Sequence, residues 1–237
     1  MNSGIRAPRR VGILGGMGPA AAIDLQAKIL AATPATIDQA HLPIVTWNVP
    51  QVPDRVAAVL GTGPSPLPAM IEGARYLEAA GCEAFAIACN TAHHWAGPLA
   101  AAVGMPLLHI ADAAMTAMES RSPAPACVGL LATRGTLASG FLGARLASRG
   151  IAWIVPTDED QRRHVNAAIA HVKAGEPAQA SELFSLAAGA LAARGADLLL
   201  LACTELPIAA RGARIGVPVL DATQALAETV VAFSLRR

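Results

Sequence analysis

The chain has 237 residues, of which 54% are hydrophobic and 15% are charged. This balance provides ample apolar surface for a folded core and excludes an intrinsically disordered chain. Aromatic residues make up only 3%, so the core must be aliphatic. The net charge is +1 with no basic block, which argues against nucleic-acid binding, because such proteins need a concentrated positive surface.

The apolar segments do not suit export or membrane insertion. The run that begins at Val11 breaks at Gly15-Gly16, before it reaches the roughly 7–15 residues of a signal-peptide core. The longest apolar stretch, residues 183–203, contains Arg194 and Asp197, and a membrane span tolerates few charges. The cysteines form no CxxC pair, so free thiols in a reducing compartment are expected. We therefore expect a soluble cytoplasmic protein with no membrane partner.

Short aliphatic runs alternate with Ala-rich stretches along the whole chain. Strands are predicted, in chain order, at residues 11–14, 44–48, 84–88, 106–110, 128–131, 152–155, 198–202 and 217–220. Helices are predicted between them, for example at residues 20–32, 70–80 and 179–194. Most strands are continuous apolar runs, which is typical of parallel strands buried on both faces. This alternation predicts an α/β fold that binds ligands at the carboxyl ends of its strands.

Three segments of the first half of the chain recur, in the same order, in the second half. The pairs are residues 11–14 with 128–131, residues 81–89 with 195–203, and residues 106–108 with 218–220. In the second pair, a glycine precedes a cysteine by eight positions in both copies, at 81 and 89 and at 195 and 203. A duplication of this kind indicates a repeated structural unit.

The duplication predicts two similar Rossmann-like lobes, each a parallel sheet flanked by helices. A pseudo-twofold axis would relate the lobes and place the active site between them. We expect an N-terminal lobe of residues 1–112 with 218–237, which carries Cys89, and a C-terminal lobe of residues 113–217, which carries Cys203.

Cys89 and Cys203 occupy matching places, each at the end of a buried strand where the chain turns toward a helix. Free amides at a helix N-terminus stabilise anions, so we expect the pKa of both thiols to be lowered. The pseudo-twofold would bring the two thiols face to face across one cleft. Such a pair suits removal of a proton from one face of a carbon and delivery to the other. Cys82 and Cys127 lack this context and are expected to be ordinary buried thiols.

Four motifs together resemble those of a known family. They are Gly15-Gly16-Met17-Gly18-Pro19, Asn48-Val49-Pro50-Gln51-Val52-Pro53-Asp54-Arg55, Cys89-Asn90-Thr91-Ala92-His93 and Cys203-Thr204-Glu205. In combination they resemble the aspartate racemase family, from about Val11 onward. The resemblance implies a pyridoxal-independent racemase that acts on a small amino acid, uses no cofactor or metal, and forms a homodimer.

The resemblance also implies residue roles. The two catalytic cysteines correspond to Cys89 and Cys203, of which Cys203 would take the proton from the L-enantiomer and Cys89 from the D-enantiomer. The groups that bind substrate carboxylates correspond to Arg55 and Lys173. The residues that cradle the substrate through their backbone correspond to Met17, Gln51, Asn90, Thr91 and Thr204. Because both cysteines are present, the resemblance favours racemisation in both directions, with aspartate and glutamate both open as substrates.

Other interpretations remain open. A G-x-G-x-x-A pattern at residues 16–21, together with Asp38, matches only part of a dinucleotide-binding fingerprint, because Asp38 precedes the second predicted strand instead of ending it. A zinc site from Cys89, His93 and Cys203 rests on a weak spacing signal, and a cap or supporting role suits His93 better. A hydantoin racemase or a non-catalytic dicarboxylate-binding protein would share the two-lobe fold.

Overall fold

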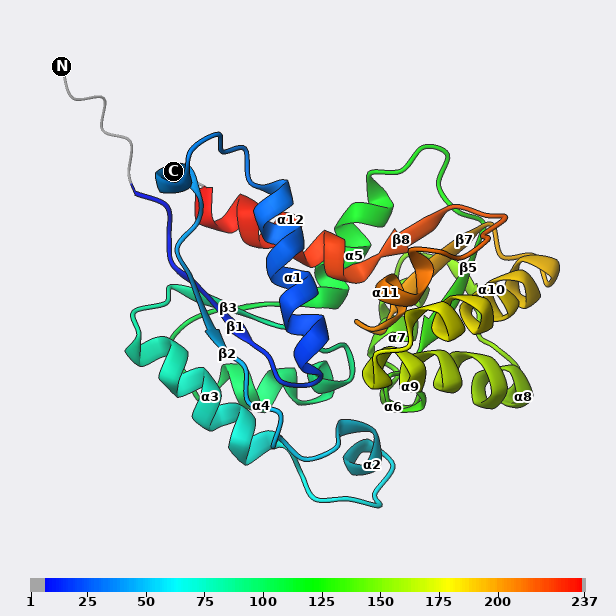
Figure 1. Ribbon diagram of the computed structural model, residues 1–237, viewed down its shortest axis with the longest axis horizontal. Helices are drawn as coiled ribbons and strands as arrows, with labels where there is room; N and C mark the ends of the chain where they lie inside the picture. The colour runs from blue at the N-terminus through cyan, green and yellow to red at the C-terminus, as the bar shows by residue number, and fades with distance from the viewer. Residues whose placement is uncertain (1–6, 236–237) are drawn as a thin grey trace.

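The computed structural model describes residues 7–235 and contains two four-stranded parallel sheets, one in each lobe (Figure 1). The first sheet has the order β2-β1-β3-β4 and the second has the order β6-β5-β7-β8. The strands of the first are β1 (Val11–Leu14), β2 (Ile44–Trp47), β3 (Ala84–Ile87) and β4 (Leu107–Leu108). Those of the second are β5 (Cys127–Ala132), β6 (Ala152–Ile154), β7 (Leu198–Ala202) and β8 (Val219–Asp221). The identical order confirms the predicted α/β fold of two repeated lobes.

The helices connect these strands in a repeating pattern. In the first half they are α1 (Pro19–Ala32), α2 (Arg55–Val59), α3 (Leu67–Ala79), α4 (Ala96–Ala100) and α5 (Ile110–Glu119), with short 3-10 turns η1 (Asp38–Ala40) and η2 (Thr91–Trp95). In the second half they are α6 (Arg134–Ser139), α7 (Phe141–Ala147), α8 (Asp158–Asp160), α9 (Asn166–Ala174), α10 (Pro177–Ala193), α11 (Leu206–Ala210) and α12 (Ala222–Leu235), with the π-helical turn η3 (Gln161–Val165). Within residues 7–235, no helix combines the length and the apolar character that crossing a bilayer requires.

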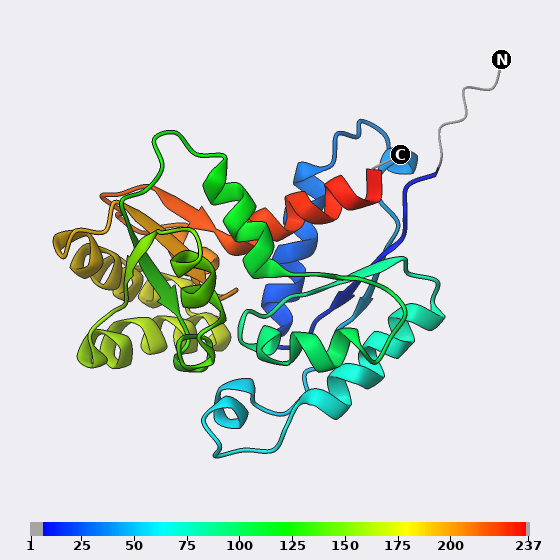
Figure 2. The ribbon, with the colours of Figure 1, turned by 180° about the vertical axis from the view of Figure 1, so that it is seen from behind.

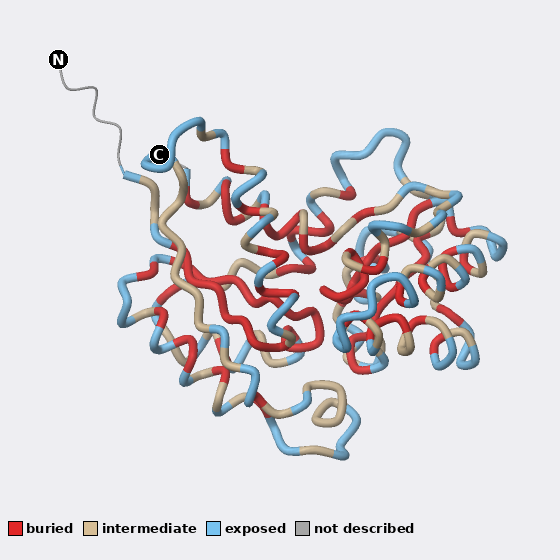
Figure 3. Tube along the Cα trace, viewed as in Figure 1, coloured by how far each residue is buried: buried red, intermediate tan, exposed pale blue. Residues whose placement is uncertain are grey.

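The central strands are buried on both faces, which explains their continuous apolar sequences (Figure 3). Successive side chains of a strand point to opposite faces. In β1, Val11 and Ile13 therefore face a core that both lobes share with α1, α5, α7 and α12, whereas Leu14 faces α3. In β7, Leu198 and Leu200 face the same shared core, and the alternate leucines pack against α9 and α10. A single apolar core thus joins the two lobes.

The glycine that recurs in the first strand of each lobe permits close packing. A Cβ on Gly12 would lie 2.9 Å from Leu77 Cδ1 of α3, and a Cβ on Gly129 would lie 2.7 Å from Leu199 Cδ2 of β7. Contacts this short do not occur between real side chains, so neither position accepts a larger residue without a shift of its neighbours. The repeated glycine reflects the repeated packing.

The last helix of each lobe packs on the other lobe (Figure 2). The helix α5 follows β4 but contacts α7, and α12 follows β8 but lies along α1 and crosses α5. The expected boundary at residue 218 assigned Val219–Asp221 to the N-terminal lobe. This assignment is wrong for these residues, because β8 pairs with β7 in the second sheet. The crossing back to the first lobe begins only with α12.

Ion pairs to the buried carboxylate of Asp24 also join the lobes. Lys28 Nζ of α1 lies 2.5 Å from Asp24 Oδ2 and 2.6 Å from Asp221 Oδ2 at the end of β8. Arg211, which follows α11, pairs with the other oxygen of Asp24. Because Asp24 is only 4% exposed, loss of its cationic partners would leave an unpaired buried charge, which strongly destabilises a fold.

Candidate active site between the lobes

The two cysteines predicted to act as a pair line the same cavity between the lobes. Cys89 follows β3 and Cys203 follows β7, so the equivalent central strands of the two sheets deliver the two thiols. The residues that line the cavity are Met17, Asp54, Arg55, Val56, Cys89, Asn90, Thr91, Thr133, Lys173, Cys203, Thr204 and Glu205. Its volume is about 20 Å³, which is room for about one water molecule. The structure is therefore in a closed conformation.

The cavity contains all the expected site residues except one. Gln51 is exposed and does not line the cavity, because the turn at residues 50–52 buries the neighbouring Val52 and leaves Gln51 in solvent. Lys173, near the end of α9, lies at the exposed rim. The remaining expected residues come together from both lobes, although 187 positions separate the first, Met17, from the last, Thr204, as their numbers indicate.

The backbone conformation of Gly16 places Met17 in the lining of the cavity. This residue has a φ of 85°, and a Cβ on it would lie 2.1 Å from the carbonyl oxygen of Val49. Glycine alone tolerates such a backbone and such an approach. The tight turn after β1 brings Met17 beside the cysteines, where it is 2% exposed.

Burial dominates the electrostatics of both thiols. Burial raises the pKa of Cys89, and the Arg55 guanidinium beside it partly opposes this rise. Burial and the neighbouring Glu205 carboxylate raise the pKa of Cys203 well above its usual value. The expectation that both pKa values are lowered is thus wrong for the closed conformation. Backbone amides do act on both thiols, at Ala92 and Glu205, but desolvation outweighs them.

Several polar atoms in the cavity wall have no hydrogen-bond partner within residues 7–235. Arg55 Nη1 donates hydrogen bonds to the carbonyl oxygens of Val52 at 3.0 Å and Pro53 at 2.9 Å. Arg55 Nε and both side-chain atoms of Asn90 are buried with no hydrogen-bond partner among the described residues. Buried polar atoms are costly without a partner, so these groups are suited to bind a polar ligand.

His93 supports Cys89 from behind the cavity. Its Nε2 accepts a hydrogen bond from the Ile110 amide at 3.2 Å, so Nδ1 carries the proton and donates to the Cys89 carbonyl oxygen at 2.8 Å. Burial, followed by the neighbouring His109, lowers the pKa of His93 to about 3. The ring is therefore neutral and fully engaged, which agrees with the expected supporting role.

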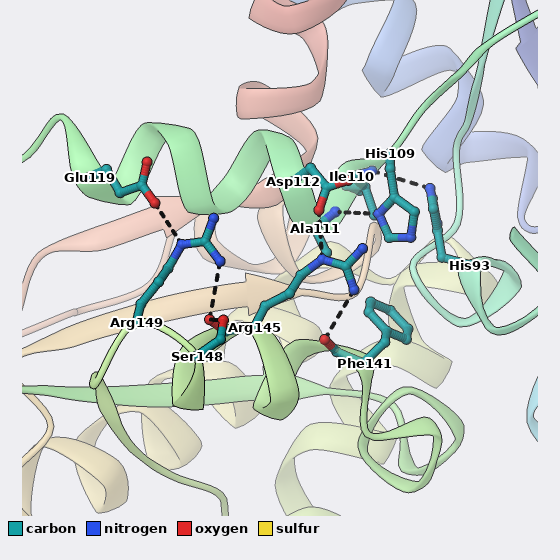
Figure 4. Close-up of polar contacts among 10 residues, drawn as sticks. All are labelled: His93, His109, Ile110, Ala111, Asp112, Glu119, Phe141, Arg145, Ser148 and Arg149. Atoms are coloured by element: carbon teal, nitrogen blue, oxygen red, sulfur yellow. Dashed lines mark hydrogen bonds and ion pairs between the residues drawn. The ribbon is translucent and has the colours of Figure 1, made fainter. Parts of the chain in front are cut away.

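The His93 ring also belongs to a cluster at the junction of the lobes (Figure 4). The rings of His93 and His109 lie 4.5 Å apart, and both lie near Phe141 of α7. Beside them, Arg145 Nε of α7 bonds Asp112 Oδ1 of α5 at 2.6 Å. This cluster links the segment that carries Cys89 to the first turn of α7.

Two contacts close the lobes over the cavity. The hydroxyl of Thr91 lies 2.8 Å from that of Thr133 and 2.9 Å from that of Thr136, so one residue of η2 meets the N-terminus of α6. Nearby, Gly135 approaches α2 so closely that a Cβ on it would lie 3.0 Å from Val56 Cα. The α2 segment thus covers the cavity and contacts the opposite lobe.

Four cavity residues had no predicted role, namely Asp54, Val56, Thr133 and Glu205. Asp54 and Thr133 are helix caps, because the side chain of each accepts a hydrogen bond from a backbone amide, of Ala57 and of Thr136. An Asp or a Thr before a helix is a recognisable signal. Glu205 belongs to the motif Cys203-Thr204-Glu205. The sequence feature that could have indicated a role for it is that it is a lone carboxylate within an apolar stretch.

Two alternative interpretations do not fit this geometry. Asp38 is exposed in η1, ahead of β2, so it is misplaced for a ribose contact in a dinucleotide site. The zinc interpretation loses His93, since both of its ring nitrogens are engaged. No group of His, Cys, Asp and Glu side chains within residues 7–235 has an arrangement suited to a metal ion.

Known proteins share this architecture. A broad-specificity amino-acid racemase from Bacillus subtilis is 29% identical over 228 residues, which span 93% of this chain and 96% of that protein. The structure of an aspartate racemase from Picrophilus torridus is similar with a TM-score of 0.84 and 32% sequence identity. The match covers 97% of this chain and 95% of the Picrophilus chain. An aspartate racemase homologue from Pyrococcus horikoshii, at 21% identity, shares the fold with a TM-score of 0.76, over 96% of this chain and 100% of its own. The sequence model of the Asp/Glu/Hydantoin racemase family matches residues 14–230, and the chain therefore belongs to this family and is an amino-acid racemase.

Proposed function

We propose that this enzyme interconverts L- and D-aspartate, without a cofactor, by proton transfer at the α-carbon between Cys89 and Cys203. One observation carries the proposal: a thiol from each lobe lines a single cavity, together with the cationic side chains of Arg55 and Lys173. The name of the Picrophilus torridus relative supports aspartate as the substrate. Glutamate is the second candidate of the same chemical class.

The reaction needs one thiolate and one thiol. The thiolate takes the α-proton and becomes a thiol, while the opposing thiol gives its proton to the other face of the carbanion and becomes a thiolate. The α-proton is far less acidic than a thiol, and each unit of pKa mismatch costs about 1.36 kcal/mol. The carbanion must therefore be stabilised by the site. The amide of Asn90 and the Nε–H of Arg55 are available donors, because the protein leaves them without a partner among the described residues.

Entry of the substrate requires the lobes to separate. A cavity of about 20 Å³ does not hold an amino acid. The contacts that must open are those of α2 and Thr91 with the N-terminal turn of α6. Closure then removes water from the reacting groups, which strengthens their electrostatic interactions. We further propose that Gln51 reaches the substrate only through its backbone or in another conformation, since its side chain is exposed here.

The two cations suit a substrate with two carboxylates. Arg55 lies inside the cavity wall, and its planar guanidinium can bind a carboxylate with two parallel hydrogen bonds. Lys173, at the rim, supplies a flexible point charge. We propose that Arg55 binds the side-chain carboxylate and that Lys173 adds attraction at the entrance.

The decisive experiment is chiral chromatography of the purified protein with L-aspartate, L-glutamate or L-alanine. We expect the D-form of aspartate to accumulate until the two enantiomers are equal, in the presence of a chelator and of hydroxylamine. Cys89→Ser and Cys203→Ser should abolish this, whereas the matched controls Cys82→Ser and Cys127→Ser should retain it. Normal racemisation by either of the first two variants would refute the two-thiol mechanism. Loss of activity in the chelator or in hydroxylamine, restored by added metal or pyridoxal phosphate, would refute independence from cofactors.

We also propose, from the family resemblance, that the enzyme forms a homodimer. The most exposed apolar side chains of α1 support an interaction surface, with Ile23 62% and Leu30 58% exposed. Light scattering coupled to size-exclusion chromatography measures the mass directly. A mass of one 24.1 kDa chain at micromolar concentration would contradict this proposal.

A further inference from the structure

Glu205 places a carboxylate directly against one of the two thiols. The residue is 5% exposed, and Cys203 Sγ donates a hydrogen bond to its Oε2 at 3.1 Å. The hydroxyl of Thr204 lies 3.3 Å from the same oxygen. A thiolate at this position would face a carboxylate at contact distance, which is electrostatically unfavourable.

Only one of the two repeated cysteine segments carries this carboxylate. Glu205 stands two positions after Cys203, and the equivalent position after Cys89 is the neutral Thr91. The cation that favours the thiolate of Cys89 is the guanidinium of Arg55, which lowers the pKa of that thiol against the effect of burial. The two lobes therefore present matching thiols but opposite charges.

The other charged and titratable groups of the cavity do not remove this difference. They are Asp54, at the start of α2, and Lys173, at the rim, and both are exposed. Glu205 has no ion-pair partner within 4.0 Å in the part of the chain that the structure describes. A Cβ on Gly18 would lie 3.4 Å from Glu205 Oε1, so the carboxylate faces the N-terminus of α1.

We infer that Glu205 is a positioning residue that keeps the proton on Cys203, so that the resting enzyme carries its thiolate on Cys89. This inference rests on the proposed two-thiol reaction and specifies which of the two cysteines is the thiolate before the first turnover. Burial and the Glu205 charge raise the pKa of both thiols. Glu205 hydrogen-bonds only Cys203, however, whereas Arg55 opposes the rise at Cys89. The free enzyme is then ready for the enantiomer whose proton Cys89 removes, which is the D-enantiomer under the family's assignment.

The kinetic consequence is specific. The two enantiomers of an amino acid are equally stable, so the equilibrium constant of the reaction is 1. The ratio kcat/KM must therefore be the same for the L- and the D-enantiomer. The bias therefore appears in kcat and KM separately, and in the first turnover. After a D-to-L turnover the thiolate is on Cys203, and the proton must return to that sulfur before the next D-enantiomer reacts.

Alkylation of the free enzyme tests the protonation order without turnover. The protein is treated with iodoacetamide between pH 6 and 10, and the modified fraction of each cysteine is measured by peptide mass spectrometry. In the wild type we expect Cys89 to be modified at lower pH than Cys203. In Glu205→Gln, which keeps the side-chain shape, Cys203 should react at least about tenfold faster at pH 7, because each unit by which a pKa falls raises the thiolate fraction about tenfold. The change at Cys89 should be smaller.

The controls separate a charge effect from a structural one. Glu182→Gln, an exposed residue of α10, removes a carboxylate remote from the cavity and should change neither cysteine. Glu205→Asp retains the charge and should keep Cys203 slow. Modification of Cys203 before Cys89 in the wild type would overturn the inference, whether or not the variants fold. Unchanged profiles in a folded Glu205→Gln would also overturn it while leaving the two-thiol reaction intact. Failure of the proposed function would instead appear as racemisation that survives Cys89→Ser.

Discussion

Gly135 marks the place where the lobes touch beside the cavity, and one added methyl group there tests whether this contact is needed for catalysis. The residue lies in the first turn of α6, opposite Val56 of α2 and Thr91 of η2. In Gly135→Ala, the new Cβ would lie 2.9 Å from Thr91 Cγ2 and 3.0 Å from Val56 Cα. The second contact is with backbone, so no side-chain rotation relieves it.

The expected effect follows from these distances. Overpacking of a close contact costs about 1–3 kcal/mol. Here the lobes can relieve it by staying apart, so the cost applies to the closed conformation and hence to the transition state. At about 1.36 kcal/mol for each factor of ten, kcat/KM for aspartate should fall roughly 5-fold to 150-fold. The open protein keeps its cores, and the thermal midpoint should change by only a few degrees.

The assay is the initial rate of change in optical rotation, measured for both enantiomers over a range of aspartate concentrations. Gly189→Ala is the matched control, because a Cβ on this exposed residue of α10 would have no neighbouring atom within 4 Å. The control should retain wild-type kinetics and gain about 0.5–1 kcal/mol of stability from the better helix former. If Gly135→Ala racemises aspartate within twofold of the wild-type rate at an unchanged thermal midpoint, contact of α2 with α6 is not part of catalysis.

Three further predictions concern individual side chains. Arg55→Ala should raise KM for aspartate about 10-fold to 150-fold more than KM for alanine, because a charged bidentate contact contributes about 1.5–3 kcal/mol; equal changes for both substrates would remove Arg55 from side-chain recognition. In deuterated water, Cys89→Ser should still exchange the α-proton of L-aspartate and Cys203→Ser that of D-aspartate, as followed by proton NMR, and exchange of the same enantiomer by both variants would contradict the assignment of faces. The fold should lose stability as the pH falls from about 6.5 toward 3, because the buried His93 has a pKa of about 3 and takes up its proton only on unfolding. His93→Gln should show a smaller drop in thermal midpoint between pH 7.5 and 4.5, and an equal drop would assign the pH dependence to other groups.

The repeated segments were sufficient to predict the fold. Apolar runs and the matched glycine-to-cysteine intervals indicated all eight strands and the two-lobe arrangement. The strand predicted at residues 106–110 is shorter in the structure, because His109 caps α5 by accepting a hydrogen bond from the Ala111 amide. Histidine is not a typical capping residue, and the apolar Leu107, Leu108 and Ile110 gave no sign of where the strand ends.

The electrostatics of the site could not be predicted in the same way. The sequence places an amide-rich turn after each cysteine, which favours a lowered pKa. In the structure the pKa of both thiols is raised instead, by burial between the lobes and by Glu205. Both effects depend on how closely the lobes approach. Similarly, Thr133 joins the site only because α6 meets η2 across the cavity, which no local pattern of residues encodes.

The exchange of α5 and α12 between the lobes has a consequence for synthesis of the protein. The strands β1 to β4 leave the ribosome well before α12, against which α1 packs in the finished protein. At about 5–20 residues per second, translation from residue 108 to residue 222 takes roughly 6 to 23 seconds. During that interval Leu25 and Ile29 of α1 lack the part of the shared core that α12 supplies through Leu226 and Val230. Substitutions that weaken α12 should therefore reduce the yield of nascent chains that reach the native state, through aggregation during translation, more than they reduce the activity of the molecules that complete folding.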